Sequence, residues 1–440
     1  MKRLVLFFYF LSGFLSVHAM EERFINEPIF NASVYMQTAG NPKNPTVVLV
    51  HGLGDEASSI WQDTIAFLED EYYVISFDLP GFGKSTKANK LYSPENYAKF
   101  THYVTQTYVK KPFHLIGHSM GGAIALKYAS MYPTDVESLI LVDAAGILHK
   151  SAYTKFLVNS GVNRFFNEQN TLVQKLQTPK LTNFIDRVAE KVDRNMTPNM
   201  DTVLASETLR ESVLGGNSHR IAAVALVQSS FNGIPQAIQT RTTLIWGEDD
   251  DVAPLQTGYV LQKLMPHASL KMIPNAQHVP ITSHEKEFFS LVSEHLKPHE
   301  NTSSKPTVYE TEPYRLKISN VTDKTYTGTI EILEIRDSHN IVIKDANIGK
   351  LLIVSSDVEI INSTLTGKDE VALTTQNSNV AIIASDLFGT IKFYKSRLDL
   401  AGIVLTSAYA PLQPMSRSIV IFSLCTMNGK LIHGKEVLGN

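Results

Sequence analysis

The sequence predicts an α/β domain with a parallel sheet, followed by an all-β domain. Between about residues 29 and 296, short apolar segments that look like strands alternate with segments that look like helices. This alternation is typical of βα units, whose parallel sheet is buried on both faces. Beyond residue 313 the pattern changes, and pairs of apolar residues recur about every 20 residues, as in repeat proteins. The 440 residues are sufficient for two or three domains.

Six strands of the first domain can be identified individually. They are expected at residues 46–50, 72–77, 113–117, 138–142, 242–246 and 269–273. Residues 147–240 interrupt the alternation, because they are mostly helical in pattern and contain no convincing strand. We interpret this stretch as an inserted helical cap over the ends of the strands.

The first 19 residues have the layout of a secretory signal peptide. Lys2 and Arg3 precede an apolar run without charge, and Val17 and Ala19 place small residues before a cleavage point. An uncleaved membrane anchor is the alternative, but the run is short for a membrane-spanning helix. We expect a secreted or periplasmic protein whose mature chain has no transmembrane segment.

The C-terminal region begins after a polar linker at residues 297–313, which contains three prolines. In residues 314–440, apolar pairs recur in steps of 17, 22, 18 and 21 residues, at Ile341/Ile343, Val358/Ile360, Val380/Ile382, Leu398/Leu400 and Ile419/Ile421. Repeats of this length predict a β-solenoid whose stacked turns share one core. The region resembles a short right-handed parallel β-helix, and an irregular β-sandwich is the alternative.

Composition and charge exclude several classes of function. The net charge of −3 provides no basic field for nucleic acid over the whole chain. Cys425 is the single cysteine, so neither an intramolecular disulfide nor a cysteine-rich zinc module can form. The sequence contains no H-E-x-x-H motif. We therefore expect no metal and no cofactor.

A candidate nucleophile lies in the segment Gly117-His118-Ser119-Met120-Gly121, which has the form G-x-S-x-G between a predicted strand and a predicted helix. A sharp strand-to-helix turn exposes the serine hydroxyl, and the small flanking residues allow the turn without a Cβ clash. The free N–H groups at the helix N-terminus point toward charge that develops near Ser119.

A serine nucleophile needs a base, and the base needs a carboxylate to orient it. Four acids follow the strand at 242–246, and His278 follows the strand at 269–273. The order Ser119, Asp250, His278 matches the nucleophile–acid–histidine order of this motif class. Asp249 and Asp251 flank Asp250 and remain alternatives for the acid.

The loop His51-Gly52-Leu53-Gly54 follows the strand at 46–50. Acyl transfer requires two N–H donors directed at the oxyanion. We expect these donors to be the backbone N–H groups of Leu53 and Met120. His51, Gly52 and His118 are expected to contact the substrate.

Together these segments resemble the α/β-hydrolase fold family, and in particular its capped branch of esterases, lipases and C–C bond hydrolases. The resemblance covers residues 25–296 and rests on HGLGDEASSIW (51–61), DLPGFGKS (78–85), GHSMGG (117–122), LIWGEDDDVAP (244–254) and NAQHVP (275–280). It implies an eight-stranded, mostly parallel sheet with a cap at 147–240. It also implies Asp250 as the acid, three residues after the glycine of W-G-x-x-D.

The function expected from these residues is a secreted serine hydrolase that acts on a small-molecule or lipid ester. A C–C bond hydrolase is one alternative, although the predicted signal peptide favours an ester outside the cytoplasm. The other alternative is a binding protein with a non-catalytic hydrolase scaffold, in which residues 314–440 contact a glycan, a cell surface or a partner.

Overall fold

The computed structural model describes residues 20–109, 112–152, 200–297, 314–367 and 370–439. The predicted signal peptide, the middle of the predicted cap and almost all of the predicted linker lie outside these residues.

The first domain is built on an eight-stranded sheet with the order β1-β2-β4-β3-β5-β6-β7-β8. β1 pairs antiparallel with β2 and β2 antiparallel with β4, and the pairings from β4 to β8 are parallel. This confirms the predicted mostly parallel, eight-stranded sheet. Its strands are β1 (Glu21–Glu27), β2 (Ala32–Ala39), β3 (Thr46–Val50), β4 (Tyr73–Phe77), β5 (Phe113–His118), β6 (Val136–Val142), β7 (Thr242–Gly247) and β8 (Ala268–Ile273).

Sequence patterns located six of these strands but not β1 and β2. β1 begins at Glu21, four residues before the expected start of the domain at residue 25. Its first four side chains are exposed, so β1 lacks the continuous apolar run that marked the central strands. An edge strand that is half in water does not need such a run.

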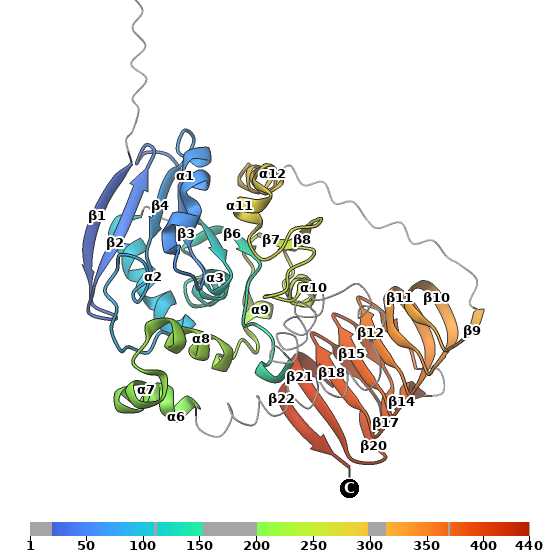
Figure 1. Cartoon of the computed structure of the whole chain (residues 1–440). Helices are drawn as coiled ribbons and strands as arrows, with labels where there is room; N and C mark the ends of the chain where they lie inside the picture. Colours follow the sequence, from blue (N-terminus) through green and yellow to red (C-terminus); the bar gives the residue numbers. More distant parts are fainter. Residues whose placement is uncertain (1–19, 110–111, 153–199, 298–313, 368–369, 440) are drawn as a thin grey trace, which may run out of the picture.

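Helices cover both faces of this sheet (Figure 1). Val48 and Val50 of β3 face a core shared with α2 (Pro94–Tyr108), α3 (Met120–Met131) and α10 (Leu255–Leu264). Val47 and Leu49 face a second core shared with η1 (Ala57–Trp61), α1 (Gln62–Leu68), α11 (Pro280–Ser283) and α12 (Glu285–Leu296). Apolar burial on alternating sides explains why β3 consists of consecutive apolar residues after Thr46.

In the described part of the insertion between β6 and β7, the chain forms helices and no strand. These helices are α6 (Met200–Ala205), α7 (Glu207–Leu214), α8 (Ser218–Gln228) and α9 (Ile234–Ala237). The Ser218 hydroxyl donates a 2.6 Å hydrogen bond to the carbonyl of Gly81, in the turn after β4. This bond joins α8 to a turn at the carboxyl end of the sheet.

Residues 314–439, here called the β-tail, form an all-β region in which successive turns pair as parallel strands. Three stacks start from the long strand β11: β12-β15-β18-β21, β13-β16-β19 and β14-β17-β20. Parallel stacking confirms the all-β class of this region, and a right-handed parallel β-helix stays a prediction. The strands are β9 (Tyr314–Ser319), β10 (Thr322–Arg336), β11 (His339–Val354), β12 (Asp357–Ile361), β13 (Thr364–Leu365), β14 (Val371–Gln376), β15 (Asn379–Ile383), β16 (Asp386–Phe388), β17 (Thr390–Tyr394), β18 (Arg397–Ala401), β19 (Val404–Thr406), β20 (Leu412–Pro414), β21 (Ser418–Met427) and β22 (Lys430–Leu438).

The register of the last repeat differs by one residue from the apolar spacing. Leu398 and Leu400 pair with Val420 and Phe422, and these two residues join the core of the β-tail, so the pair that continues the stack is 420/422 and not the apolar pair Ile419/Ile421 noted in the sequence. The segment from Ile419 to Phe422 is apolar throughout, and alternation therefore cannot show which side chains face inward. Stacking on the preceding turn determines the register.

A ladder of buried serines, which the sequence analysis did not identify, runs through one corner of the β-tail. The backbone N–H of each of the first four serines donates to the hydroxyl of the serine one turn later, over 3.0–3.3 Å. In all five serines, the hydroxyl donates to the carbonyl two residues earlier. The ladder satisfies buried turn groups that no strand pairing reaches. Its members are Ser338, Ser356, Ser378, Ser396 and Ser418.

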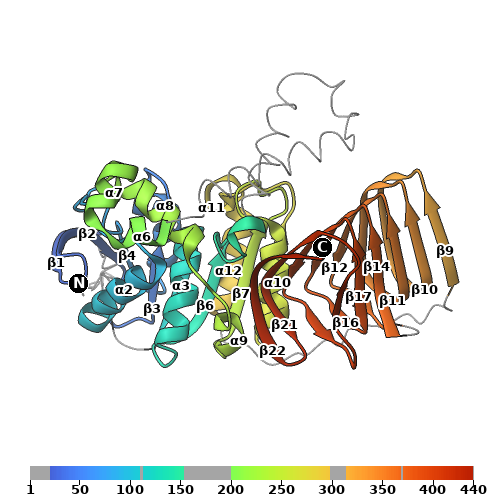
Figure 2. The same ribbon diagram turned by 90° about the horizontal axis from the view of Figure 1, so that it is seen from below.

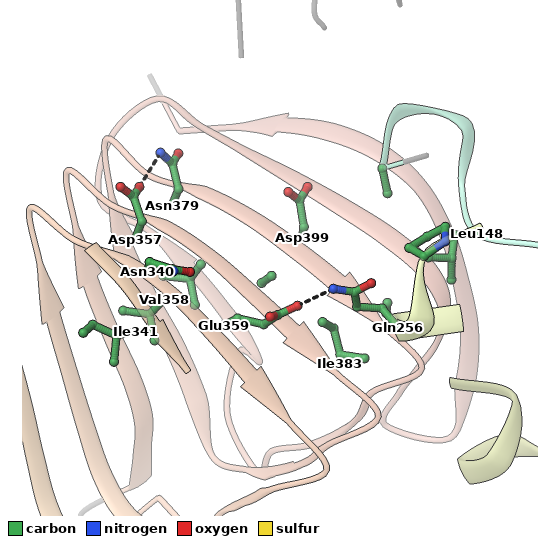
Figure 3. A pocket seen from close by; sticks show the side chains of 15 residues that line it. Leu148, Gln256, Asn340, Ile341, Asp357, Val358, Glu359, Asn379, Ile383 and Asp399 are labelled. Carbon is green, nitrogen blue, oxygen red and sulfur yellow. Dashed lines mark hydrogen bonds between the residues drawn. The ribbon is translucent and has the colours of Figure 1, made fainter. Parts of the chain in front are cut away.

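The β-tail packs against α10 of the first domain, with β21 and β22 at the near end and β9 at the far end (Figure 2). Lys263 forms a 2.7 Å ion pair with Asp386, and Gln256 donates to Glu359 at 2.8 Å. Ile361 and Ile383 join the apolar core of the first domain. A cavity of 340 Å³ remains between the two parts, bordered by Pro254 and Gln256 on one side and by turns of the β-tail on the other (Figure 3).

Candidate active site

Ser119 lies at the tight turn between β5 and α3. Its backbone has φ 54° and ψ −119°, a strained conformation for a residue with a side chain. A Cβ on Gly117 would overlap the carbonyl oxygen of Gly121, and a Cβ on Gly121 would overlap that of Val50. Glycine is therefore required on both sides of the serine, because backbone meets backbone within the turn at Gly117 and against the end of β3 at Gly121.

A continuous chain of hydrogen bonds joins the three predicted catalytic residues. Ser119 Oγ lies 2.9 Å from His278 Nε2, and His278 Nδ1 lies 2.9 Å from Asp250 Oδ2. An ionised carboxylate only accepts hydrogen bonds, so Nδ1 carries the proton and Nε2 is free to accept from the serine. This is the geometry that a general base needs to deprotonate a serine.

Asp250 is the acid that faces His278. Its other oxygen accepts hydrogen bonds from the N–H groups of Val252 and Ala253, at 2.8 and 2.9 Å. Asp249 is exposed and Asp251 is half-buried, whereas Asp250 is buried. Three donors therefore hold the Asp250 carboxylate toward the imidazole, and the geometry favours Asp250 over its neighbours.

The loop after β3 lies directly against the serine. A Cβ on Gly52 would come within 2.8 Å of Ser119 Cβ, and Leu53 is on the wall of the adjoining pocket. Met120 is the first residue of α3, so its N–H has no acceptor within the helix. Leu53 and Met120 are thus close to the nucleophile, and their role as oxyanion donors remains a proposal.

His51 is placed differently from the expectation of substrate contact. Its Nδ1–H donates to the carbonyl of Gly52 at 2.6 Å, and its Nε2 accepts from the N–H of Leu79 at 2.9 Å. Burial lowers the pKa of His51 to about 4, so the ring is neutral at physiological pH. Because both nitrogens bond to the backbone, the contacts favour a role in fixing the Gly52–Leu53 loop.

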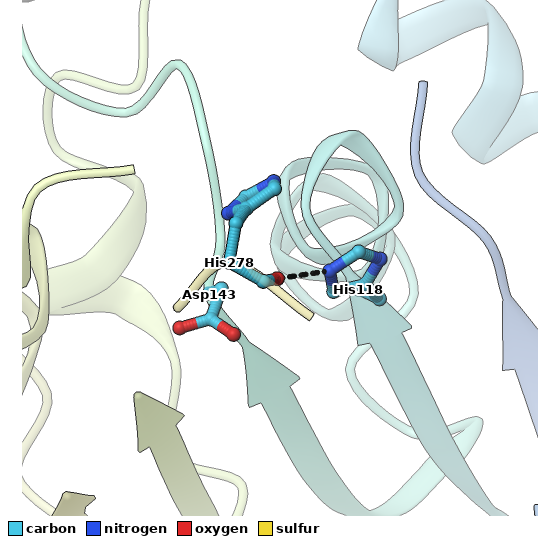
Figure 4. Close-up of side chains that lie close together, drawn as sticks. All are labelled: His118, Asp143 and His278. Atoms are coloured by element: carbon cyan, nitrogen blue, oxygen red, sulfur yellow. Dashed lines mark hydrogen bonds between the residues drawn. The ribbon is translucent and has the colours of Figure 1, made fainter. Parts of the chain in front are cut away.

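His118 lines the pocket beside Ser119 and also contacts the backbone of His278. Its Nε2–H donates to the backbone carbonyl of His278 at 2.8 Å (Figure 4). Burial lowers the pKa of His118 to about 3, and the neighbouring His278 acts in the same direction. A neutral His118 thus holds the His278 backbone in place.

Asp143 was missed in the sequence analysis. It follows β6 directly and is completely buried, and its Oδ1 accepts the N–H of Gly247 at 2.8 Å. The signal available in the sequence was an aspartate immediately after the predicted strand at 138–142. In a parallel sheet the residues after each strand meet at one edge, which brings Asp143 beside the Asp250 loop.

Among the described residues, His118, Asp143 and His278 form one group with metal-ligand chemistry, since one donor atom of each lies within 4.8 Å of the others. Both nitrogens of His278 already bond to Ser119 and Asp250. A metal at His278 would displace one of these partners, so we attribute the group to hydrogen bonding within the site.

A pocket of 450 Å³ opens beside Ser119 and His278. Leu53, Ile60 and Val279 provide apolar surface, and Glu56, Ser59 and Thr282 provide polar groups. A cleft of this kind can hold an acyl or alcohol group next to the serine hydroxyl.

These features define an α/β protein in which a buried serine at a strand-to-helix turn lies within hydrogen-bonding distance of a histidine. A comparison with protein-family models matches residues 45–285 to the alpha/beta hydrolase fold. The chain belongs to the alpha/beta hydrolase fold family. The matched segment ends before the β-tail begins.

Individual relatives are more distant. An uncharacterized hydrolase of Bacillus subtilis (strain 168) is 28% identical over 268 residues, which cover 60% of this chain and 93% of the relative. Lipase 1 of Psychrobacter immobilis is 29% identical over 244 residues, which cover 55% and 74%. An esterase structure from Exiguobacterium antarcticum has a TM-score of 0.45 and 20% identity, covering 62% of this chain and 99% of the esterase. Within the described residues, no helix is both long and apolar enough to cross a membrane.

Proposed function

We propose that this protein is a serine hydrolase that cleaves carboxylic esters through an acyl-enzyme on Ser119. The observation that carries the proposal is the unbroken hydrogen-bond chain from Ser119 through His278 to Asp250. The same contacts oppose the alternative of a non-catalytic scaffold, since that function would not require a base aligned on a buried serine.

In the proposed reaction, His278 Nε2 takes the proton from Ser119 while Oγ attacks the ester carbonyl carbon. The N–H groups of Leu53 and Met120 stabilise the oxyanion, and the imidazolium is stabilised by Asp250. His278 then donates the proton to the departing alcohol. Water then attacks the acyl-enzyme carbonyl with His278 as the base. This step releases the carboxylic acid and restores free Ser119.

A lipid ester is the substrate class we favour. Leu53, Ile60 and Val279 supply an apolar surface next to the serine, and the names of relatives include a lipase. A secreted or periplasmic location, with residues 1–19 as signal peptide, belongs to the same proposal. Contact of the β-tail with a glycan or cell surface stays a prediction from the sequence.

The test is hydrolysis of p-nitrophenyl esters with acyl chains from two to sixteen carbons. We expect activity in the full chain, and a loss on the order of 10⁴-fold or more in Ser119→Ala. Ser212→Ala, which changes an exposed serine on α7, is the matched control and should retain full activity. Equal rates for Ser119→Ala and the control would exclude the proposed nucleophile, and the chain-length profile would measure the size of the acyl pocket.

A further inference from the structure

Two aspartates from neighbouring strand ends lie side by side beneath His278. Asp250 accepts the Nδ1–H of His278 at 2.9 Å. A carboxylate oxygen of Asp143 lies within 4.8 Å of a ring nitrogen of the same histidine (Figure 4). Both carboxyls are buried, and Asp143 has no exposed surface at all.

The donors around the two carboxyls are unequally distributed. Asp250 accepts three hydrogen bonds, from His278, Val252 and Ala253. Asp143 accepts one, from Gly247, and its Oδ2 is buried without a donor among the described residues. An ionised carboxylate with an unsatisfied buried oxygen is costly, whereas a protonated one converts that oxygen into a donor.

The proton of a neutral Asp143 has an acceptor within reach. The Asp143 side chain lies in hydrogen-bonding range of the Asp250 carboxyl. Burial raises the pKa of the Asp143 carboxyl well above its usual range, and the charge of Asp250 beside it acts in the same direction. Two carboxyls in such contact do not both ionise, and the donors gather on Asp250, which accepts three hydrogen bonds where Asp143 accepts one.

We propose that Asp143 is a positioning residue which, as a neutral acid, donates its O–H to the Asp250 carboxylate and accepts the N–H of Gly247. Gly247 begins the loop that carries Asp250, so one side chain holds both the acid and its loop. Gly247 is also packed closely against the His278 loop, since a Cβ on it would lie 2.6 Å from the Ala276 carbonyl oxygen. Asp143 thereby acts on His278 through Asp250, without contacting the substrate.

This inference rests on the proposed function and leads to a sharp distinction between two substitutions. Asp143→Asn retains a donor toward Asp250 and an acceptor for Gly247 but is always neutral. Asp143→Ala removes both hydrogen bonds. We expect the kcat for a p-nitrophenyl ester to fall about 10- to 100-fold in Asp143→Ala, because the base loses its orientation. Asp143→Asn should recover most of that loss.

The second measurement is the pKa of His278, followed by NMR of its imidazole in the full chain and assigned by its absence in His278→Gln. The titratable groups that face this ring are Asp250, Asp143, His118 and, across the pocket, Glu56. A neutral Asp143 predicts the same His278 pKa in the wild-type protein and Asp143→Asn. Removal of an ionised carboxylate at this range would lower it by about one unit or more.

A fall of that size in Asp143→Asn would overturn the proposal, because Asp143 would then be an anion. A kcat in folded Asp143→Ala equal to that of the wild-type protein would also overturn it. If Asp143→Ala does not fold, Asp143→Asn and the His278 titration still decide the charge of Asp143. If the wild-type protein hydrolyses no ester, the proposed function fails, and the NMR titration tests the Asp143 arrangement independently of activity.

Discussion

Gly402 of the β-tail packs directly against Val260 of helix α10. A Cβ on Gly402 would lie 2.9 Å from Val260 Cγ1, and the backbone of Gly402 is left-handed, with φ 59°. The contact lies beside the Lys263–Asp386 ion pair, on the helix that starts four residues after Asp251. The β-tail is therefore packed onto the helix that follows the loop carrying Asp250.

This contact predicts that Gly402→Ala destabilises the protein more than an equivalent change away from the interface. Gly429 is the matched control, because its φ is 77° and a Cβ there meets nothing within 4 Å. The left-handed backbone should cost about 1–2 kcal/mol in either variant. Crowding against Val260 should add about 1–3 kcal/mol at Gly402 alone. Urea unfolding measures the loss of unfolding free energy in both variants. Equal losses would show that the interface accommodates the added Cβ without crowding.

The buried histidines predict a loss of stability in acid. The pKa of His118 is about 3 in the folded protein and close to 6.5 in an unfolded chain. Between these values the unfolded chain binds more protons, so the free energy of unfolding decreases as the pH falls from about 6.5 to about 3. One such histidine contributes a slope of up to about 1.4 kcal/mol per pH unit, and His51 acts in the same direction down to about pH 4.

His118→Gln tests this pH dependence, because glutamine does not titrate and its amide can donate to the His278 carbonyl. We expect a shallower decrease of the unfolding free energy between pH 6.5 and 4 in urea titrations. His267→Gln, at an exposed position, should leave the slope unchanged. A slope in His118→Gln equal to that of the wild-type protein would mean that His118 is not the group responsible.

The serine ladder predicts that a single hydroxyl supports the stacking of two turns. In Ser378→Ala, the buried N–H of Ser356 loses its acceptor. An unsatisfied buried N–H costs about 1–3 kcal/mol, which should appear as a lower urea midpoint of the transition that includes the β-tail. Ser319→Ala is the control at an exposed position and should change stability by no more than about 0.5 kcal/mol. A urea midpoint in Ser378→Ala equal to that of the wild-type protein would show that water replaces the missing hydroxyl.

Much of the site could be predicted from the sequence because its chemistry is carried by short segments. Glycine at 117 is demanded locally by the turn around Ser119, whereas glycine at 121 is demanded by the close approach of Val50 at the end of β3. Asp250 and His278 each follow a recognisable apolar strand, and parallel strands bring such positions to one edge. Asp143 satisfied the same rule but has no motif around it, so only its burial and its contact with Gly247 distinguish it from an ordinary loop aspartate.

The sequence by itself determined the parallel sheet, the turn at Ser119 and the repeating β-tail, because periodic burial and backbone sterics act over a few neighbouring residues. The tertiary structure alone decided that Asp250 rather than Asp249 faces His278, and that both nitrogens of His51 bond to the backbone. It also decided that Val420 rather than Ile419 faces inward, and that the β-tail packs on α10. Each of these outcomes depends on contacts between segments far apart in the chain, which no local pattern encodes.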